Sequence, residues 1–240
     1  MQPTVEPFYL EEADDFRLTS AFLEAITPGV EMVFLCEPNN PTGLATPRPL
    51  LERVVERCAQ VGALLVADEC FGDLLDDPAA HTLTGLLARF PNLLILKAFT
   101  KLYAMAGVRL GYCLCADPAL LVAMQATGQP WAVSTLAQAA GLAALGEQDY
   151  VARVRTLVRA QRPWLADALA GLGLRVVPGQ ANYLLFYSPT PLAQPLEARG
   201  ILIRSCANYP GLGEGWYRVG VRTAAENQRL AAALGPVLLG

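Results

Sequence analysis

The chain has 240 residues, of which 53% are hydrophobic, and its formal net charge at pH 7 is −4. This length allows one or two domains with a large hydrophobic core, and the acidic balance lacks the basic footprint of a nucleic-acid-binding protein. The single histidine argues against a multi-histidine metal site and a histidine-based catalytic triad, so we expect no metal.

The sequence gives no sign of a targeting or membrane segment. The N-terminal residues have no basic region before an apolar stretch, so they do not resemble a signal peptide. Residues 118–146 carry no charge, but glutamines, glycine and proline interrupt the run, which favours two buried helices around a turn. The six cysteines form no CxxC pair, as is typical of reduced thiols. We therefore predict a cytoplasmic protein without a membrane span.

Strands and helices alternate in the first part of the chain. Thr46 and Pro47 have the features of a helix N-cap and a first helical residue. Apolar strands separated by helices indicate a mostly parallel sheet with both faces covered, and sites in such sheets gather at the carboxyl ends of the strands. The predicted elements are strands at 32–36, 63–67, 93–98 and 110–115 and a helix at 48–61.

The second part of the chain is predicted to form a smaller α/β unit after several helices. The long helix at 149–172 carries four arginines, Arg153, Arg155, Arg159 and Arg162, which we interpret as a solvated face. We place the boundary near residue 150, which gives domains of residues 1–150 and 151–240. The other predicted elements are helices at 117–126, 132–146, 191–199 and 224–235 and strands at 174–177, 182–187, 201–204 and 216–221.

A lysine and an arginine follow the third predicted strand. Lys101 comes just after the apolar run, and Arg109 follows eight residues later. Burial lowers the pKa of an amine, and a neutral amine can attack a carbonyl, while the planar guanidinium suits a phosphate. This pair suggests pyridoxal 5′-phosphate (PLP), an aldehyde that carries a phosphate. The alternative is a surface lysine beside a structural arginine.

Two further stretches support the PLP hypothesis. The first strand leads into CEPNNPTG at 36–43, and the second ends in LLVADECF at 64–71. PLP chemistry uses an anion at the pyridine nitrogen, because a protonated ring is the better electron sink. Asp68 could supply that anion, and Asn40 could donate a hydrogen bond near the phenolic oxygen of the ring.

The order of these motifs resembles the class I/II aminotransferases of the aspartate-aminotransferase superfamily. Asn-Pro-Thr-Gly, then aspartate, then Thr-Lys with arginine eight residues on, is highly specific as a combination. The resemblance implies a PLP-dependent transferase fold of the α/β class, with a partial large domain and a small C-terminal α/β domain. It also implies Lys101 and Asp68 as catalytic residues. The cofactor-binding residues that it implies are Asn40, Asp68, Phe71, Thr100, Lys101 and Arg109.

The resemblance also places substrate-binding residues in the C-terminal part. Arg218 lies within an apolar strand, where a charge needs a partner, and the family's arginine at this place binds the substrate's α-carboxylate bidentately. Arg204 would suit a second phosphate in the subfamily that acts on phosphorylated substrates. Arg222 and Asn182 are further candidates. Structural ion pairs, or a satisfied amide for Asn182, are the alternatives.

Local features favour one branch of the superfamily. The layout resembles histidinol-phosphate aminotransferases and the threonine-phosphate decarboxylases of cobalamin synthesis. Phe71 stands where most aminotransferases of the group have tyrosine, and the segments Thr100–Met105 and Pro130–Ser134 resemble the decarboxylases. We therefore expect decarboxylation of a small amino-acid phosphate, with transamination as the alternative.

Two departures from the family affect this interpretation. Ala98 stands where the family has a hydroxyl residue that touches the cofactor phosphate. No counterpart of the upstream phosphate-cradling turn or of the ring-stacking aromatic residue is visible before Met1. We expect a homodimer, or a partner chain that supplies the missing segment. An inactive remnant with a binding or scaffold role stays open as the other class of function.

Overall fold

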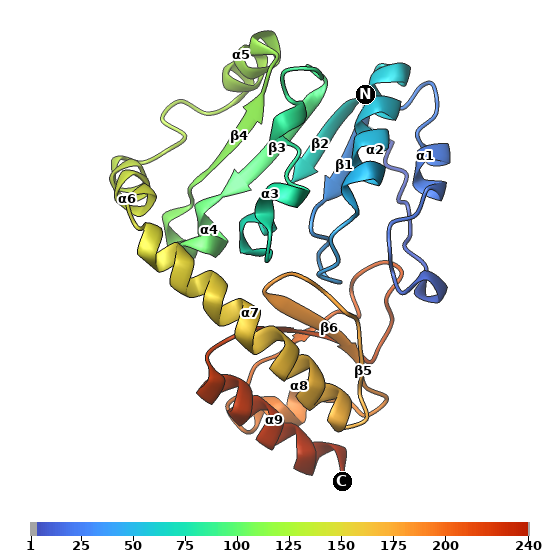
Figure 1. Ribbon diagram of the computed structural model, residues 1–240, viewed down its shortest axis with the longest axis vertical. Helices are drawn as coiled ribbons and strands as arrows, with labels where there is room; N and C mark the ends of the chain where they lie inside the picture. The colour runs from blue at the N-terminus through green and yellow to red at the C-terminus, as the bar shows by residue number, and fades with distance from the viewer. Residues whose placement is uncertain (1–3, 240) are drawn as a thin grey trace.

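The computed structural model describes residues 4–239 and contains two α/β units connected by the long helix α7 (Figure 1). The strands of the first unit are β1 (Met32–Cys36), β2 (Leu64–Asp68), β3 (Leu93–Ala98) and β4 (Gly111–Cys115). Its helices are α1 (Ala21–Ala25), α2 (Arg48–Val61), α3 (Pro78–His81), α4 (Phe99–Leu102), α5 (Pro118–Thr127) and α6 (Thr135–Leu145). Among these residues no helix has the length and apolar character needed to cross a membrane.

The first sheet has the strand order β1-β2-β3-β4. The β1–β2 and β2–β3 pairs are parallel, and β3–β4 is antiparallel. Cys36 is paired with Asp68, and Ala98 with Gly111. The predicted mostly parallel sheet is therefore confirmed. The carboxyl ends of β1, β2 and β3 meet at one edge, where their following loops gather.

Helix α2 covers one face of this sheet and contributes four buried side chains to its core. Leu51, Val54, Val55 and Cys58 recur at helical spacing and are fully buried against β1, β2 and β3. Burying each of the side chains of Leu51, Val54 and Val55 contributes about 1.5 to 3 kcal/mol. The N-cap is Pro47, one residue after the predicted Thr46. No side chain caps the first turn of α2, and the backbone N–H of Thr46 donates to Glu37 Oε1 instead.

Glu37 is a buried carboxylate just after β1. Its Oε1 accepts a hydrogen bond from Thr46 N (2.6 Å), whereas Oε2 is buried and has no hydrogen-bond partner within residues 4–239. Burial raises the pKa of Glu37 from 4.5 to about 7, although the hydrogen bonds from Thr46 oppose that rise. The folded protein therefore holds a proton on Glu37 that the unfolded chain releases at lower pH.

We expect the free energy of unfolding to decrease between about pH 4.5 and pH 7. The stabilisation from the Glu37 proton is fully present below pH 4.5 and is lost as the pH rises through about 7. The loss is on the order of 3 kcal/mol. Glu37→Gln should flatten this part of the profile, as urea unfolding across the pH range would show. Parallel profiles for the variant and the unaltered protein would contradict the expectation.

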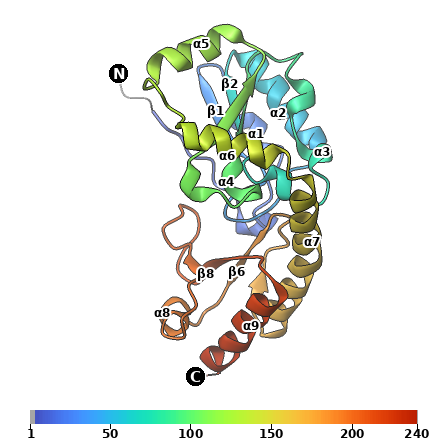
Figure 2. The ribbon, with the colours of Figure 1, turned by 90° about the vertical axis from the view of Figure 1, so that its left-hand side faces the viewer.

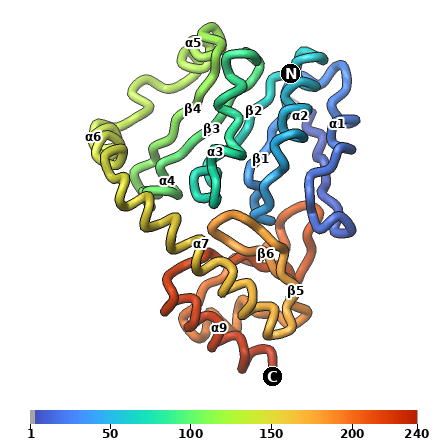
Figure 3. Tube along the Cα trace, in the orientation of Figure 1, coloured from blue at the N-terminus to red at the C-terminus, as the bar shows by residue number. Residues whose placement is uncertain are grey.

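Helix α7 (Gln148–Gly171) runs from the first unit along the second, as Figure 3 shows. The solvated-face interpretation is wrong for Arg155 and Arg162, which are partly buried, whereas the Arg159 side chain is 63% exposed. Arg155 Nε donates to Asp73 O (2.9 Å), Arg159 Nη2 donates to Asp76 O (2.8 Å), and Arg162 forms an ion pair with Asp76. These contacts connect α7 to the segment after β2. The predicted domain boundary near residue 150 lies in the first turn of α7 and stays a prediction.

The second unit has an antiparallel sheet with the strand order β5-β6-β8-β7. The strand predicted at 201–204 is mostly wrong, because β7 pairs with β8 only at Arg204 and Ser205. Buried leucines and aromatic rings between this sheet, α7 and α9 form the second core. The elements are β5 (Arg175–Val176), β6 (Tyr183–Tyr187), β7 (Arg204–Ser205), β8 (Trp216–Gly220), α8 (Ala193–Glu197) and α9 (Ala224–Leu238).

The expectation that α5 and α6 are buried is also wrong. Both lie at the outer edge of the first unit in Figure 1, and Figure 2 shows the unit from the side of α6; α5 has no buried residue. Large apolar side chains point to solvent on and near these helices, with Trp131 95% and Leu136 83% exposed. On β1, Phe34 is 71% exposed. Helices that are apolar all round are usually covered, so this surface favours association.

We expect the isolated chain to self-associate through this surface. Light scattering should give a mass above the 25.7 kDa of one chain. Replacing Leu136 and Leu142, both exposed on α6, by lysine should move the mass toward 25.7 kDa. Two lysines introduced at exposed polar positions of α7 are the control, because they add the same charge away from this surface. A monodisperse monomer for the unaltered chain would contradict this expectation.

Candidate active site

The loop after β1 packs against the second unit through its backbone. Gln180 N and Ala181 N donate to Gly43 O (2.7 and 3.1 Å). A Cβ added to Gly179 would lie 2.7 Å from Thr42 O and 3.2 Å from Gly43 Cα, so this close approach requires glycine. Tyr183 Oη donates to Asn39 O (2.9 Å). The predicted NPTG motif thus lies where the two units meet.

A continuous row of side chains runs along this junction. Lys101 Nζ is 5.1 Å from the ring centroid of Phe71, and the Phe71 ring lies edge-on to that of Tyr183, with their centroids 5.0 Å apart. On the second unit, the Arg218 guanidinium lies 5.1 Å from the Tyr183 ring centroid and hydrogen-bonds to Asn40 Oδ1. Both cations have the arrangement of cation–π contacts. Four predicted site residues are therefore brought together around Tyr183.

Asp68 is the last residue of β2, and the thiols of Cys36 and Cys70 lie near its carboxylate. Its Oδ1 accepts a hydrogen bond from Cys70 N (3.0 Å), which leaves Oδ2 for another donor. Burial, with a further contribution from the Asp68 charge, raises the pKa of both Cys36 and Cys70 to about 12. Because only a thiolate is an effective nucleophile, neither thiol competes with an amine at neutral pH.

The chain contains two lysines, and their surroundings differ. Lys97 in β3 is 7% exposed and forms ion pairs with Glu69 Oε2 (3.0 Å) and Asp73 Oδ1 (3.2 Å). Lys101 in α4 is exposed, and no carboxylate of residues 4–239 forms an ion pair with it. The Lys101 amine is therefore the one that a carbonyl compound could reach.

The expected burial of Lys101 is wrong. Strand β3 ends at Ala98, and one turn of helix follows, which moves Lys101 out of the sheet and into solvent. Lys101 is therefore not the buried amine that the sequence predicts. The buried lysine is Lys97, whose pKa the charges of Glu69 and Asp73 raise although burial alone would lower it.

Two arginines of the second unit lie directly opposite each other. Arg204 in β7 is the register partner of Arg218 in β8, so the two side chains start from the same face of the sheet. Arg204 Nη2 donates to Asn208 Oδ1 (3.0 Å), and its guanidinium lies 5.7 Å from the Tyr209 ring centroid. Neither arginine forms an ion pair with a carboxylate of the described chain.

The remaining predicted residues are less involved. Arg222 Nε donates to Glu226 Oε1 (2.7 Å) at the start of α9, so it is already paired outside this group. Asn182 Oδ1 is buried and has no hydrogen-bond partner in residues 4–239. Thr100 is half-buried in α4, and Arg109 is exposed, with Nη1 donating to Ala106 O (3.1 Å). Roles for these four residues stay predictions.

Sequence reasoning missed Tyr183, Glu69 and Asp73. Tyr183 lies between Phe71 and Arg218, and burial raises the pKa of its hydroxyl well above the ordinary value, so the hydroxyl stays protonated. Nothing in the local pattern of Ala-Asn-Tyr distinguishes this ring from a core tyrosine. The charge of Lys97 inside an apolar strand was the signal that could have led to Glu69 and Asp73.

Comparison with protein families gives one match that spans most of the chain. The model of the family "Aminotransferase class I and II" matches residues 2–234. A threonine-phosphate decarboxylase of Salmonella typhimurium is 43% identical over 235 residues, which are 96% of this chain and 64% of that protein. A histidinol-phosphate aminotransferase of Symbiobacterium thermophilum is 38% identical over 221 residues, covering 91% and 60%. The chain thus spans less than two thirds of the length of these relatives.

Solved structures share the fold. The histidinol-phosphate aminotransferase from Clostridium acetobutylicum has a TM-score of 0.90 at 24% identity, with 96% of this chain and 70% of that one covered. The L-threonine-O-3-phosphate decarboxylase from Porphyromonas gingivalis has a TM-score of 0.77 at 25% identity, with 88% and 65% covered. The two units and their connecting helix therefore have the arrangement of a known fold.

Proposed function

The chain belongs to the aminotransferase class I and II family, and we propose that it works with PLP on a small amino acid that carries a phosphate. The reaction that we favour is the decarboxylation of threonine phosphate. A histidinol-phosphate-type amino transfer is the second candidate, and a binding or scaffold role without catalysis is the third.

The residues present suit the cofactor of this family. Lys101 offers an exposed amine without an ion pair, and Asp68 offers a carboxylate oxygen beyond the one that Cys70 N occupies. Asn182 Oδ1 is buried and has no partner in residues 4–239, so a donor from a bound molecule would satisfy it. PLP would thus be held by Lys101 and Asp68, with Phe71 beside the amine.

When bound, PLP supplies an electron sink for negative charge at the α-carbon of the substrate. Asp68, as a carboxylate, would keep a proton on the nitrogen of the cofactor ring. Lys101 Nζ would hold the cofactor and, when free, would carry a proton to or from the substrate. Phe71 has no hydroxyl, so it adds packing and a cation–π contact but no hydrogen bond.

The opposed Arg204 and Arg218 carry the proposal about the substrate. Like charges directly across two strands are destabilising, and no carboxylate of the described chain forms an ion pair with either. An amino acid with a carboxylate and a phosphate has two anionic groups to neutralise them. Arg218, already beside Asn40, would bind the carboxylate, and Arg204 would bind the phosphate.

We favour decarboxylation for two reasons. The relative that is 43% identical is named a threonine-phosphate decarboxylase, whereas the aminotransferase described above is 38% identical. Phe71 stands where most aminotransferases of the group have tyrosine, which also favours the decarboxylase branch. In this reaction the bond between the carboxylate and the α-carbon breaks, its electron pair stays on carbon, and a proton replaces the carbon dioxide. For amino transfer the pocket would instead release the α-hydrogen.

We also propose that the protein works together with a second polypeptide chain. The uncovered apolar side chains of α5, α6 and β1 are suited to contact with a second copy or with a separate partner chain. No nucleic acid or membrane is proposed as a partner.

We expect the chain with PLP to release carbon dioxide from threonine phosphate. Arg204→Gln should weaken this substrate about 10- to 100-fold, because it removes a charge-assisted contact to the phosphate. Arg199→Gln, an exposed arginine whose guanidinium bonds to Pro195 O, is the matched control. Transfer of an amino group from histidinol phosphate to 2-oxoglutarate, without release of carbon dioxide, would favour amino transfer over decarboxylation. PLP binding without either product would favour the non-catalytic role.

A further inference from the structure

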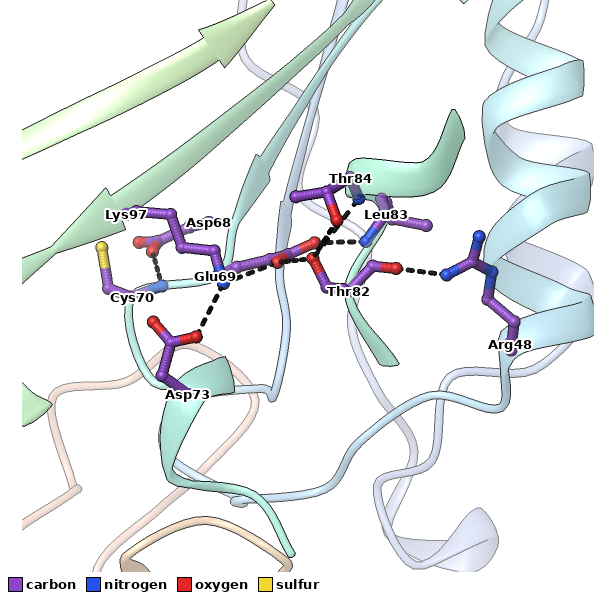
Figure 4. A network of polar contacts seen from close by, with 9 residues as sticks. All are labelled: Arg48, Asp68, Glu69, Cys70, Asp73, Thr82, Leu83, Thr84 and Lys97. Carbon is purple, nitrogen blue, oxygen red and sulfur yellow. Dashed lines mark hydrogen bonds and ion pairs between the residues drawn. The ribbon is translucent and has the colours of Figure 1, made fainter. Parts of the chain in front are cut away.

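The segment after β2 is tied to a buried ammonium at two positions. Lys97 Nζ lies 3.0 Å from Glu69 Oε2 and 3.2 Å from Asp73 Oδ1, as Figure 4 shows. Glu69 is 2% exposed, and the site residue Phe71 lies between the two acids in the sequence. One cation therefore fixes both ends of the five-residue turn 69–73.

Both carboxylate oxygens of Glu69 have hydrogen-bond or ion-pair partners within the protein. Its Oε1 accepts a hydrogen bond from Leu83 N (2.7 Å), and its Oε2 accepts one from Thr82 Oγ1 (2.7 Å) as well as the contact with Lys97. Asp73 is held through its backbone as well, because Arg155 donates to Asp73 O. The turn is thereby connected to β3, to the loop at 82–84 and to α7.

The turn places two proposed site residues. Side chains alternate along a strand, so Asp68 and Glu69 point to opposite faces of the sheet. Asp68 Oδ1 accepts from Cys70 N, and Gly72 N donates to Glu69 O (3.0 Å), which completes the backbone of the turn. Movement at Glu69 or Asp73 would therefore be transmitted directly to the carboxylate of Asp68 and to the ring of Phe71.

We propose that Lys97, through Glu69 and Asp73, is a positioning residue that holds Asp68 and Phe71 against the cofactor. This inference rests on the proposed PLP function. A contribution to folding alone would not require both acids to flank the site turn. Breaking a buried ion pair leaves an uncompensated charge, so Lys97→Met is a severe change that could prevent folding. Asp73→Ala is milder, because it leaves Lys97 and Glu69 as a neutral pair and keeps the contact of Arg155 with the backbone.

The test compares Asp73→Ala with Asp73→Glu and Leu234→Ala. Leu234 is fully buried in the second core, so its truncation lowers stability without touching the turn. We expect Asp73→Ala to raise the dissociation constant of PLP about tenfold and to shift the pH at which the absorbance of bound PLP changes. Asp73→Glu should restore most of the affinity. Leu234→Ala, at the same loss of melting temperature, should leave both readouts unchanged.

Hydrogen exchange on the PLP-free chain separates this inference from the proposed function. In Asp73→Ala the amides of residues 69–73 should exchange faster, whereas those of α2 should not. Unchanged exchange in the turn would overturn the inference, as would equal loss of PLP affinity in Leu234→Ala. Failure of the unaltered chain to bind PLP would instead overturn the proposed function, while the exchange experiment would still decide whether Lys97 and Asp73 hold the turn.

Discussion

Lys101→Ala is expected to eliminate the covalent attachment of PLP that borohydride reduction makes permanent. It is also expected to lower turnover at least about 100-fold. Lys101 combines an exposed amine with a position beside Phe71, and no carboxylate of the described chain neutralises it. Alanine removes the amine and keeps the helical preference of α4, so folding should change little. Absorbance of the reduced adduct and assay of carbon dioxide release measure the two effects.

Peptide mapping gives an unambiguous control, because Lys97 is the only other lysine of the chain. Lys97 forms ion pairs with Glu69 and Asp73. If its amine were attached covalently to PLP, one buried and one partly buried carboxylate would lose their partner. We therefore expect the PLP label on the peptide of Lys101 alone. A label on Lys97 would remove Lys101 from the mechanism and would contradict the positioning role of Lys97.

Most strands of the first unit could be predicted because their residues form continuous apolar runs. The observed bounds of β1 and β3 equal the predicted ones, and Asp68 ends β2. The rule that sites gather at the carboxyl ends of parallel strands directs attention to the loop of Asn40, which lies where the two units meet. Local pattern alone could not find Tyr183, because its partners Phe71 and Arg218 are distant in the sequence.

The wrong predictions have a common cause in long-range contacts. Helical periodicity predicts solvated arginines on α7 because it does not reveal that Asp73 O and the Asp76 carboxylate lie opposite Arg155 and Arg162. Apolar composition predicts that α5 and α6 are buried, but α5 has no buried residue and α6 buries only Ala137, Gly141 and Ala144. Composition indicates that a face prefers to be covered, whereas the structure shows whether it is.

Asp68→Asn is expected to lower turnover about 100- to 1000-fold while changing the free energy of unfolding little. Asparagine keeps an oxygen that can accept the hydrogen bond from Cys70 N (3.0 Å in the present structure), so the start of the turn should persist. It cannot supply the negative charge that would keep a proton on the ring nitrogen of PLP. Carbon dioxide release and urea unfolding measure the two quantities separately.

Asp117→Asn is the matched control for this substitution. Asp117 Oδ1 accepts a hydrogen bond from Ala119 N (2.8 Å), two residues on, as Asp68 Oδ1 does from Cys70 N, but Asp117 caps α5 and is absent from the row of side chains at the junction. The same change of charge and shape at Asp117 should therefore leave turnover unaltered. If Asp68→Asn turned over as fast as Asp117→Asn, the carboxylate of Asp68 would have no part in the chemistry, and the proposed arrangement of the cofactor would be wrong.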